Sequence, residues 1–187
     1  MALLHQATVT PSKLELVRDW LPSQPWFVGE KGATLEPIAA YRFDDPDGEV
    51  GVETLLTATS DGVVFQVPVT YRGAPLEGAE HWLIGTMEHS VLGSRWVYDG
   101  LGDPVYLATV AHAVRTGGHQ ADLLVEIDGE MITREPTARV QGSGSGSESA
   151  TVSVVRYPVA GAVAAGDVLT GTWGGHTEPV LLVSLEG

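Results

Sequence analysis

The chain has 187 residues, 43% hydrophobic and 18% charged, a composition typical of a folded protein with one domain or two small lobes. Its formal net charge of −14 repels phosphate backbones and anionic lipid surfaces, which argues against nucleic-acid and membrane partners. The sequence has no cysteine, which excludes disulfides, thiolate metal sites and cysteine nucleophiles. Because it shows neither a signal-peptide pattern nor a run of about 20 apolar residues, we expect a cytoplasmic protein.

The N-terminal part of the sequence predicts one strand and one short helix. Leu3–Thr10 has the composition of a strand. Ser12 and Glu15 have the spacing of a capping box, in which each side chain bonds to the backbone N–H of the other residue, so a helix should begin here. Pro22 lacks the N–H that a helix interior needs and should end the helix. Four apolar side chains should form the buried face of this helix, namely Leu14, Val17, Trp20 and Leu21.

From residue 34 the sequence changes to the pattern of β-strands. Leu35–Phe43, Glu49–Ala58 and Gly62–Tyr71 are separated by turn-forming residues rich in Asp and Gly, which predicts consecutive antiparallel hairpins. In the third strand Pro68 cannot donate a backbone hydrogen bond, so this stretch should lie at a sheet edge or a bulge. The alternation along this strand predicts that the core-facing residues are Val63, Phe65, Val67 and Val69, rather than Val64, Gln66, Pro68 and Thr70.

The second half of the sequence predicts one more helix among further strands. Asp103 and Pro104 suit the start of a helix, and Gly117-Gly118 suits its end. Gln141–Ser149 is rich in glycine and serine and is either a flexible loop or a short linker. The other predicted strands are His81–His89, Ser94–Tyr98, Asp122–Glu126 and Glu130–Thr133 with a turn at Asp128-Gly129, Thr151–Tyr157, Val168–Trp173 and Val180–Leu185.

These elements together indicate an α+β fold. We expect a curved antiparallel sheet packed on the N-terminal helix, followed by a second β-rich subdomain that contains one helix. The expected division is an α+β lobe over residues 1–100 and a helix plus β-rich subdomain over residues 101–187. The sequence leaves open whether the second part is separate or closes the first sheet.

No set of residues in the sequence has the pattern of a known catalytic, cofactor or metal site. His81 and His89 are the most conspicuous pair, but in one extended strand they would lie about 26 Å apart unless the chain folds back at Gly85. A phosphate-binding loop needs Lys followed by Ser or Thr after its last glycine, and the glycine-rich stretch has Ser147-Glu148 there. We therefore predict no catalytic, cofactor-binding or metal-binding residues, and no cofactor.

Several segments resemble the N-terminal cap of bacterial maltokinases, enzymes that phosphorylate maltose with ATP. The similarity begins with the Trp-Leu-Pro-Ser-Gln-Pro-Trp-Phe-Val-Gly stretch of Trp20–Gly29. It continues in Val67–Leu76, His81–Gly85 and Trp96–Gly100, and ends with Asp103-Pro104. The resemblance implies a cap fold in which a strongly curved antiparallel sheet surrounds a helix, somewhat as in cystatins, and it makes residues 1–100 a cap-like lobe.

The resemblance does not extend to kinase chemistry. In the complete kinases, ATP-binding and catalytic lobes follow the cap. Neither Lys13 nor Lys31 lies where a nucleotide-pairing lysine would be needed, and no HxD-type catalytic loop follows. What the resemblance implies is a stand-alone cap-like protein without the kinase lobes.

The function implied by this resemblance is that of a non-catalytic accessory or binding module linked to α-glucan, trehalose or sugar-phosphate metabolism. The expected partner is a sugar kinase or another α-glucan pathway protein, or a glycan, while the oligomeric state is left open. Two alternatives remain: a regulatory cap subunit acting in trans on a separate sugar kinase, and a small enzyme with an unrecognised site. The first suspects for such a site are Glu80, His81, Glu88, His89 and Asp99.

Aromatic side chains beside charged groups bind sugar rings in some proteins and fill cores in others. We take seven residues of this kind as the candidate surface for a partner or a glycan: Trp26, Tyr71, Arg72, His81, Trp96, Tyr98 and Asp99.

Overall fold

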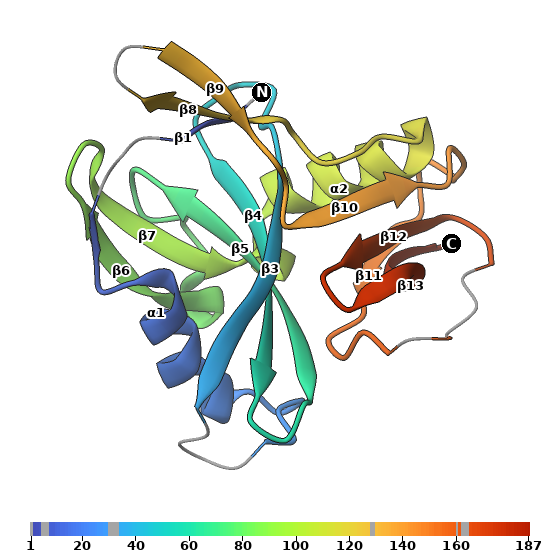
Figure 1. Cartoon of the computed structure of the whole chain (residues 1–187), viewed down its shortest axis with the longest axis horizontal. Coiled ribbons are helices and arrows are strands. Elements are labelled where there is room, and N and C mark those ends of the chain that lie inside the picture. Colours follow the sequence, from blue (N-terminus) through green and yellow to red (C-terminus); the bar gives the residue numbers. More distant parts are fainter. Residues whose placement is uncertain (1, 5–7, 30–33, 128–129, 160, 162–164) are drawn as a thin grey trace.

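The computed structural model of the chain is mostly β, with a curled antiparallel sheet that forms a half-barrel and two α-helices (Figure 1). The structure describes residues 2–4, 8–29, 34–127, 130–159, 161 and 165–187. The helices are α1 (Lys13–Trp20) and α2 (Pro104–Thr116), with single 3₁₀ turns at Leu21–Ser23, Glu80–Trp82 and Gly100–Gly102. The strands are β1 (Ala2–Leu4), β2 (Val9–Thr10), β3 (Leu35–Phe43), β4 (Gly51–Thr59), β5 (Val64–Arg72), β6 (Leu83–His89), β7 (Gly93–Asp99), β8 (Leu123–Ile127), β9 (Glu130–Arg134), β10 (Ala138–Gly142), β11 (Thr151–Val154), β12 (Val168–Trp173) and β13 (His176–Glu186).

The strands of the described residues form three sheets. The half-barrel is six-stranded and entirely antiparallel, in the order β2-β6-β7-β5-β4-β3. A four-stranded antiparallel sheet has the order β10-β12-β13-β11, and a three-stranded sheet has the order β1-β8-β9 with β1 parallel to β8. The consecutive hairpins predicted for β3, β4 and β5 are confirmed.

Helix α1 begins with the predicted capping box. The Ser12 hydroxyl accepts from the Glu15 backbone N–H at 3.3 Å, and the Glu15 carboxylate accepts from the Ser12 backbone N–H at 2.8 Å. The apolar side of α1 packs into one cluster with core-facing residues of the half-barrel. The buried members of this cluster are Val17, Trp20, Leu21, Leu35, Phe65, Val67, Val69, Met87 and Val97.

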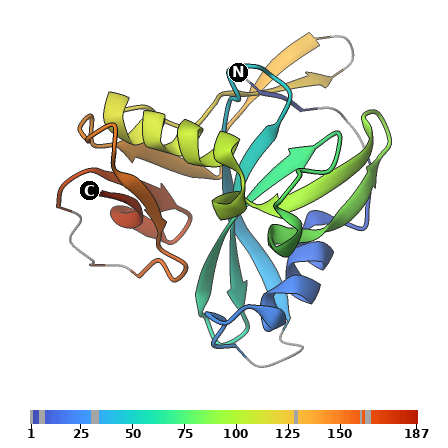
Figure 2. The ribbon, with the colours of Figure 1, turned by 180° about the vertical axis from the view of Figure 1, so that it is seen from behind.

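The second helix belongs to a different core, on the other side of the half-barrel sheet (Figure 2). Asp103 caps its first turn by accepting from the Val105 N–H at 2.9 Å, and Gly117 ends it with a left-handed φ of 68°. This core joins α2 to β3, β4 and the four-stranded sheet, through buried residues that include Tyr41, Phe43, Val52, Leu56, Tyr106, Val110, Val114, Leu169 and Leu182. It therefore contains residues from both sides of the expected boundary at residue 100, and the division into two lobes stays a prediction.

Both faces of the half-barrel are thus buried at β4 and β5, which the alternation of β5 did not indicate. Phe65, Val67 and Val69 face α1 as predicted, but Gln66 and Thr70 on the opposite face are also fully buried. In β3 a bulge between Pro37 and Ala39 inserts one residue, so Leu35 joins the core of α1 whereas Tyr41 and Phe43 join the core of α2. The sheet is a shared wall between the two cores.

The prediction that Pro68 lies at an edge or bulge is wrong for the strand as a whole. β5 is an inner strand, paired with β4 over its length and with β7 from Val69 onward. β7 does not reach Gln66, and on that side of β5 the backbone N–H of Gln66 donates to the Arg156 carbonyl at 2.9 Å. Pro68 lies between these two partners, where no ladder hydrogen bond is made, so its missing N–H is tolerated.

Other predicted elements differ in their ends. The predicted first strand is two strands in different sheets, β1 and β2, and the three residues between them lie outside the described part of the chain. The hairpin of β8 and β9 is confirmed, while its predicted turn at Asp128-Gly129 also lies outside the described residues. No helix in the described part of the chain has both the length and the apolar character needed to cross a membrane.

Candidate functional site

The start of α2 is fixed by an ion pair that includes one candidate-surface residue, Arg72. Its Nε and Nη2 atoms donate to the two carboxylate oxygens of Asp103, each at 2.7 Å. The Thr70 hydroxyl donates to the same carboxylate at 2.7 Å. Burial would raise the pKa of Asp103, but the bonds from Arg72 and Thr70 outweigh it and lower the pKa. Arg72 therefore ties β5 to the N-terminus of α2.

A second ion pair joins the end of β7 to the segment that follows β11. Arg156 donates to the carboxylate of Asp99, which is 1% exposed. Burial raises the pKa of Asp99 although the Arg156 charge acts in the opposite direction. The Arg156 guanidinium also lies 4.5 Å from the centre of the Trp26 ring, within the range of a cation–π contact. Asp99 and Trp26, two candidate-surface residues, are thus brought together by Arg156, a residue that no local pattern indicated.

Trp26 is part of an aromatic cluster beneath α1. Its ring contacts Trp20 and Tyr157 edge-on, with ring centres 5.9 and 6.2 Å apart. The Tyr157 hydroxyl donates to the Trp26 carbonyl and accepts from the Val28 N–H. The Tyr157 ring also packs against Phe65 at 5.1 Å. The segment after β11 therefore holds the region of the Trp-Leu-Pro stretch against the half-barrel.

Tyr71 belongs to a third cluster, around the buried carboxylate of Glu53. Oε2 of Glu53 accepts from the Tyr71 hydroxyl at 2.7 Å, from Lys13 Nζ at 2.6 Å and from Arg42 Nη2 at 3.2 Å. Burial would raise the pKa of Glu53, but the charges of Arg42 and Lys13 outweigh it and lower the pKa to about 2. This cluster joins α1, β3, β4 and β5, and nothing in the sequence pattern indicated it.

Of the remaining three candidate-surface residues, Tyr98 and Trp96 lie on β7 beside the cluster of Thr70 and Arg72, and His81 lies in the 3₁₀ turn Glu80–Trp82. Tyr98 is buried, and its hydroxyl accepts from the backbone N–H of Leu76 at 2.8 Å. Trp96 is half-buried and lies opposite Arg72 in the ladder of β5 and β7. His81 is exposed and its ring lies against Trp82, with ring centres 5.0 Å apart.

The candidate surface is consequently split between the two faces of the sheet. Because side chains alternate along a strand, Tyr71 and Asp99 face one side of the half-barrel, whereas Arg72, Trp96 and Tyr98 face the other. Buried ion pairs and packing engage most of these residues. Their role as a surface for a partner or a glycan stays a prediction.

The residues suspected of an unrecognised catalytic site are also separate. β6 runs without a reversal from Leu83 to His89, so His81, in the 3₁₀ turn before this strand, and His89, at its far end, are separated by its whole length. The His89 Nδ1 accepts from the backbone N–H groups of Val91 and Leu92, at 3.2 and 3.1 Å, and so closes the turn before β7. Within the described ranges, no three His, Asp or Glu side chains are grouped so that they could hold a metal ion.

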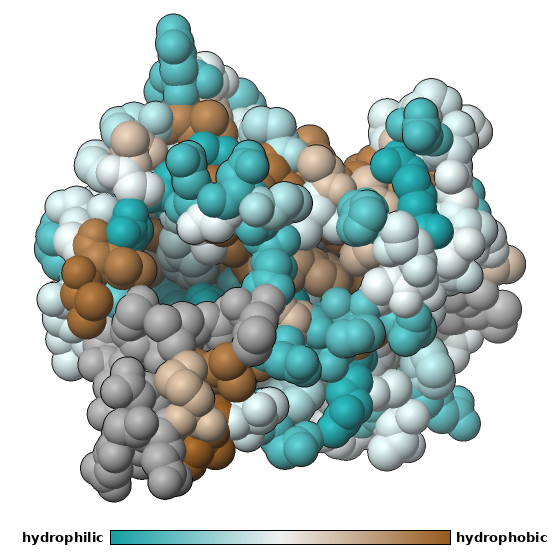
Figure 3. Space-filling model, turned by 90° about the horizontal axis from the view of Figure 1, so that it is seen from above, coloured by the Kyte–Doolittle hydropathy of each residue, from teal (hydrophilic) through white to brown (hydrophobic). Residues whose placement is uncertain are grey.

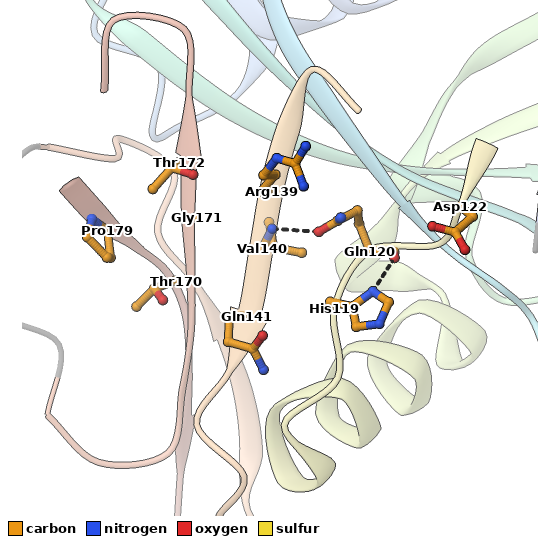
Figure 4. Close-up of a pocket in the computed structure, with 10 residues that line it drawn as sticks. All are labelled: His119, Gln120, Asp122, Arg139, Val140, Gln141, Thr170, Gly171, Thr172 and Pro179. Atoms are coloured by element: carbon orange, nitrogen blue, oxygen red, sulfur yellow. Dashed lines mark hydrogen bonds between the residues drawn. The ribbon is translucent and has the colours of Figure 1, made fainter. Parts of the chain in front are cut away.

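A surface pocket lies outside all of these clusters, on the outer face of the four-stranded sheet (Figure 4). It has a volume of about 460 Å³. The Gln120 side chain is fixed at its wall by accepting from the Val140 N–H at 2.8 Å, and the His119 Nδ1 donates to the Gln120 carbonyl at 2.8 Å. The lining offers one cation, one carboxylate, amides and hydroxyls, through His119, Gln120, Asp122, Arg139, Val140, Gln141, Thr170, Gly171, Thr172 and Pro179. Sequence reasoning missed it because its residues come from three separate segments.

Comparison with known protein families finds a similarity that covers most strands of the half-barrel. Residues 20–103 match the family model of the maltokinase N-terminal cap domain. This matched stretch, called the cap domain below, extends from the end of α1 to the N-cap of α2 and includes β3, β4, β5, β6 and β7. No curated protein matches the chain.

All seven candidate-surface residues lie inside the matched domain, whereas Arg156, Tyr157 and the pocket lie outside it.

Proposed function

We propose that this protein is a non-catalytic accessory module of sugar metabolism that acts by binding, in the α-glucan, trehalose or sugar-phosphate branch. The observation that carries the proposal is the match of residues 20–103 to the cap domain of maltokinases. The partner is a sugar kinase or another protein of the α-glucan pathway, and a glycan is the alternative ligand. The finer picture of a cystatin-like cap, with its sheet curved around α1, belongs to the same proposal.

The electrostatics of the cap domain support binding over phosphoryl transfer. Phosphoryl transfer needs positioned cations that neutralise the charge developing on the phosphate. In the cap domain, Arg42 and Arg72 are engaged with the buried carboxylates of Glu53 and Asp103. These ion pairs hold elements of the fold together, and the net charge of −14 around them repels a nucleotide.

A second candidate function, a regulatory cap acting in trans on a separate kinase chain, is favoured by the same match. The cap and the segment around Arg156 form one packed unit, since Gln66 donates to the carbonyls of Val155 and Leu182 at 2.9 and 2.8 Å. A cap held in this way is a rigid body that a kinase could engage without refolding.

Thermal unfolding in the presence of maltose, maltoheptaose and ATP with Mg²⁺ tests the proposal, because a ligand that binds the folded state raises its melting temperature. We expect a rise with maltoheptaose or with an added maltokinase, and phosphorylation of maltose no faster than in buffer. His81→Ala, inside the candidate surface, should reduce the rise, whereas His112→Ala on the exposed side of α2 should not. ATP-dependent turnover of maltose by this chain alone, or a melting temperature that no sugar or kinase changes, would contradict the proposal.

A further inference from the structure

The pocket on the outer face of the four-stranded sheet has a polar side that the strand register builds (Figure 4). In the ladder of β10 and β12, Arg139 lies opposite Thr172 and Gln141 lies opposite Thr170. Because side chains alternate along a strand, these four share one face, while residues between them, such as Val140, belong to the core. The register therefore places a cation, an amide and two hydroxyls side by side in the lining of the pocket.

The loop between α2 and β8 forms the wall of the pocket. The Gln120 Oε1 accepts from the Val140 backbone N–H at 2.8 Å, which fixes this loop along the outer edge of β10. The His119 Nδ1 donates to the Gln120 carbonyl at 2.8 Å, and the Gln141 Nε2 donates to the Gly117 carbonyl at 2.6 Å. These bonds hold three polar side chains of the lining in fixed positions.

Each of these three side chains also keeps one polar atom for a ligand. The bonds use one end of each group, so within the described part of the chain Gln120 Nε2, Gln141 Oε1 and His119 Nε2 have no hydrogen-bond partner. Gln120 Nε2 is a donor, whereas Gln141 Oε1 and the Nε2 of the neutral His119 ring are acceptors. Such a set is pre-organised for binding, because the side chains are already ordered before a ligand arrives.

The charges of the lining do not favour an ionic ligand. Arg139 is the cation, and its Nη2 already donates to the exposed Glu135 carboxylate at 2.7 Å. Asp122 also lines the pocket, and its carboxylate repels anions. Because Arg139 and Asp122 compensate each other, neither a phosphate nor an ammonium group would find a lining of one sign.

The ligand that fits this lining is small, neutral and rich in hydroxyl groups. Sites for apolar ligands are lined mainly by hydrophobic and aromatic side chains, whereas here Val140 and Pro179 lie among polar residues. The volume of about 460 Å³ falls in the range of small-molecule sites, about 300–1,000 Å³. We propose that this pocket binds a neutral mono- or disaccharide, whose hydroxyl groups both donate and accept hydrogen bonds.

Other exposed features of the molecule give a ligand less to recognise. Seen from above, apolar side chains reach the surface in several separate patches (Figure 3). Scattered apolar residues are normal on a protein surface, whereas a binding surface is usually one contiguous patch. The pocket gathers fixed polar atoms from three segments of the chain, all of them outside residues 20–103. A saccharide bound here would therefore bind independently of a partner on the cap domain.

A titration followed by ¹H–¹⁵N NMR tests the site directly, because the chain has five glutamines and no asparagine. The side-chain NH₂ signals of Gln120 and Gln141 should shift as glucose or maltose is added, whereas those of the fully buried Gln66 should not. If neither sugar shifts the signals of Gln120 and Gln141, the proposed site is wrong. Shifts confined to residues 20–103 would also overturn it, by placing the sugar on the cap domain and leaving the proposed function of that domain intact.

Removing the two hydroxyls of β12 tests how the sugar is recognised. Thr170→Val and Thr172→Val keep the β-branched shape but remove a group that both donates and accepts. The double variant should raise the dissociation constant for glucose or maltose about tenfold. Thr133→Val is the matched control, since Thr133 is exposed on β9 outside the pocket and the variant should bind like the wild type.

Circular dichroism checks that these variants fold. A folded double variant that binds both sugars as tightly as the wild type would contradict the proposal. Tighter binding of glucose 6-phosphate or of glucosamine than of glucose would contradict it as well, because charge rather than hydroxyl groups would then select the ligand.

Discussion

Glu53 shows how a single buried side chain can organise three elements of this fold. Its carboxylate oxygen accepts from Lys13 at the start of α1, from Arg42 in β3 and from Tyr71 in β5. A buried carboxylate with two cations and a hydroxyl is stable as long as all the partners remain, because removing one leaves an uncompensated buried charge. The stability of the cap domain should therefore depend on the ionisation of Glu53.

The pKa of about 2 for folded Glu53 predicts a specific acid sensitivity. Because the pKa is depressed below the ordinary value of 4.5, the ionised group stabilises the fold above about pH 4.5, and this contribution is lost as the pH falls toward 2. The lost free energy of unfolding is about 3 kcal/mol. Urea unfolding at several pH values should show a steeper loss for the wild type than for Glu53→Gln, whereas the exposed Glu178→Gln should behave like the wild type. Parallel pH profiles for the wild type and Glu53→Gln would contradict this account.

Arg156 provides a second test at the residue scale. Arg156→Met keeps the apolar contact with Trp26 but leaves Asp99 buried without its cation, which should lower the free energy of unfolding by about 3 kcal/mol. Arg18→Met removes the exposed ion pair with Asp19 and should change the stability far less, because solvent screens an exposed pair. Chemical unfolding of both variants measures the difference, and equal losses would show that the Asp99 pair has no special role.

At the scale of elements, the beginning of α2 depends on one carboxylate. Asp103 caps the helix, accepts two bonds from Arg72 and is fully buried. Asp103→Ala removes the helix cap and leaves the Arg72 guanidinium without its carboxylate partner, so it should lower the free energy of unfolding by about 3 kcal/mol. Ser12→Ala at the start of α1 removes only a cap and should lower it by about 1 kcal/mol. Equilibrium unfolding in urea distinguishes the two losses. If Asp103→Ala cost no more than Ser12→Ala, the ion pair with Arg72 would contribute nothing beyond the cap.

The sequence predicts features that depend on neighbouring residues and misses contacts between residues that are far apart in the chain. The capping box of Ser12 and Glu15 and the start of α2 at Asp103 are local signals, so both helices were found. Glu53 and Lys13 are 40 positions apart, and Gln66 and Val155 are 89 apart, so no local pattern could indicate their contacts. The residues of the candidate surface were selected by type, and the chain distributes them over two faces of a sheet and three separate clusters.

At the scale of the whole molecule, the half-barrel is a shared wall between two cores. Its α1 side contains the Trp26 cluster, and its α2 side joins the four-stranded sheet through side chains such as Tyr41 and Leu56. The segment Val155–Tyr157 links the two sides through Gln66, Asp99 and Trp26. This part of the chain lies outside residues 20–103, so the cap domain is held in one arrangement by contacts from beyond the domain itself.

The central claim is that this protein acts by binding, as a cap, rather than by catalysis. Isothermal titration of the chain into a bacterial maltokinase from which the N-terminal cap has been deleted tests it most directly. We predict saturable binding that His81→Ala or Trp96→Ala weakens and that His112→Ala leaves unchanged. Titrations without heat of binding at any concentration, both for that kinase and for maltoheptaose, would contradict the claim.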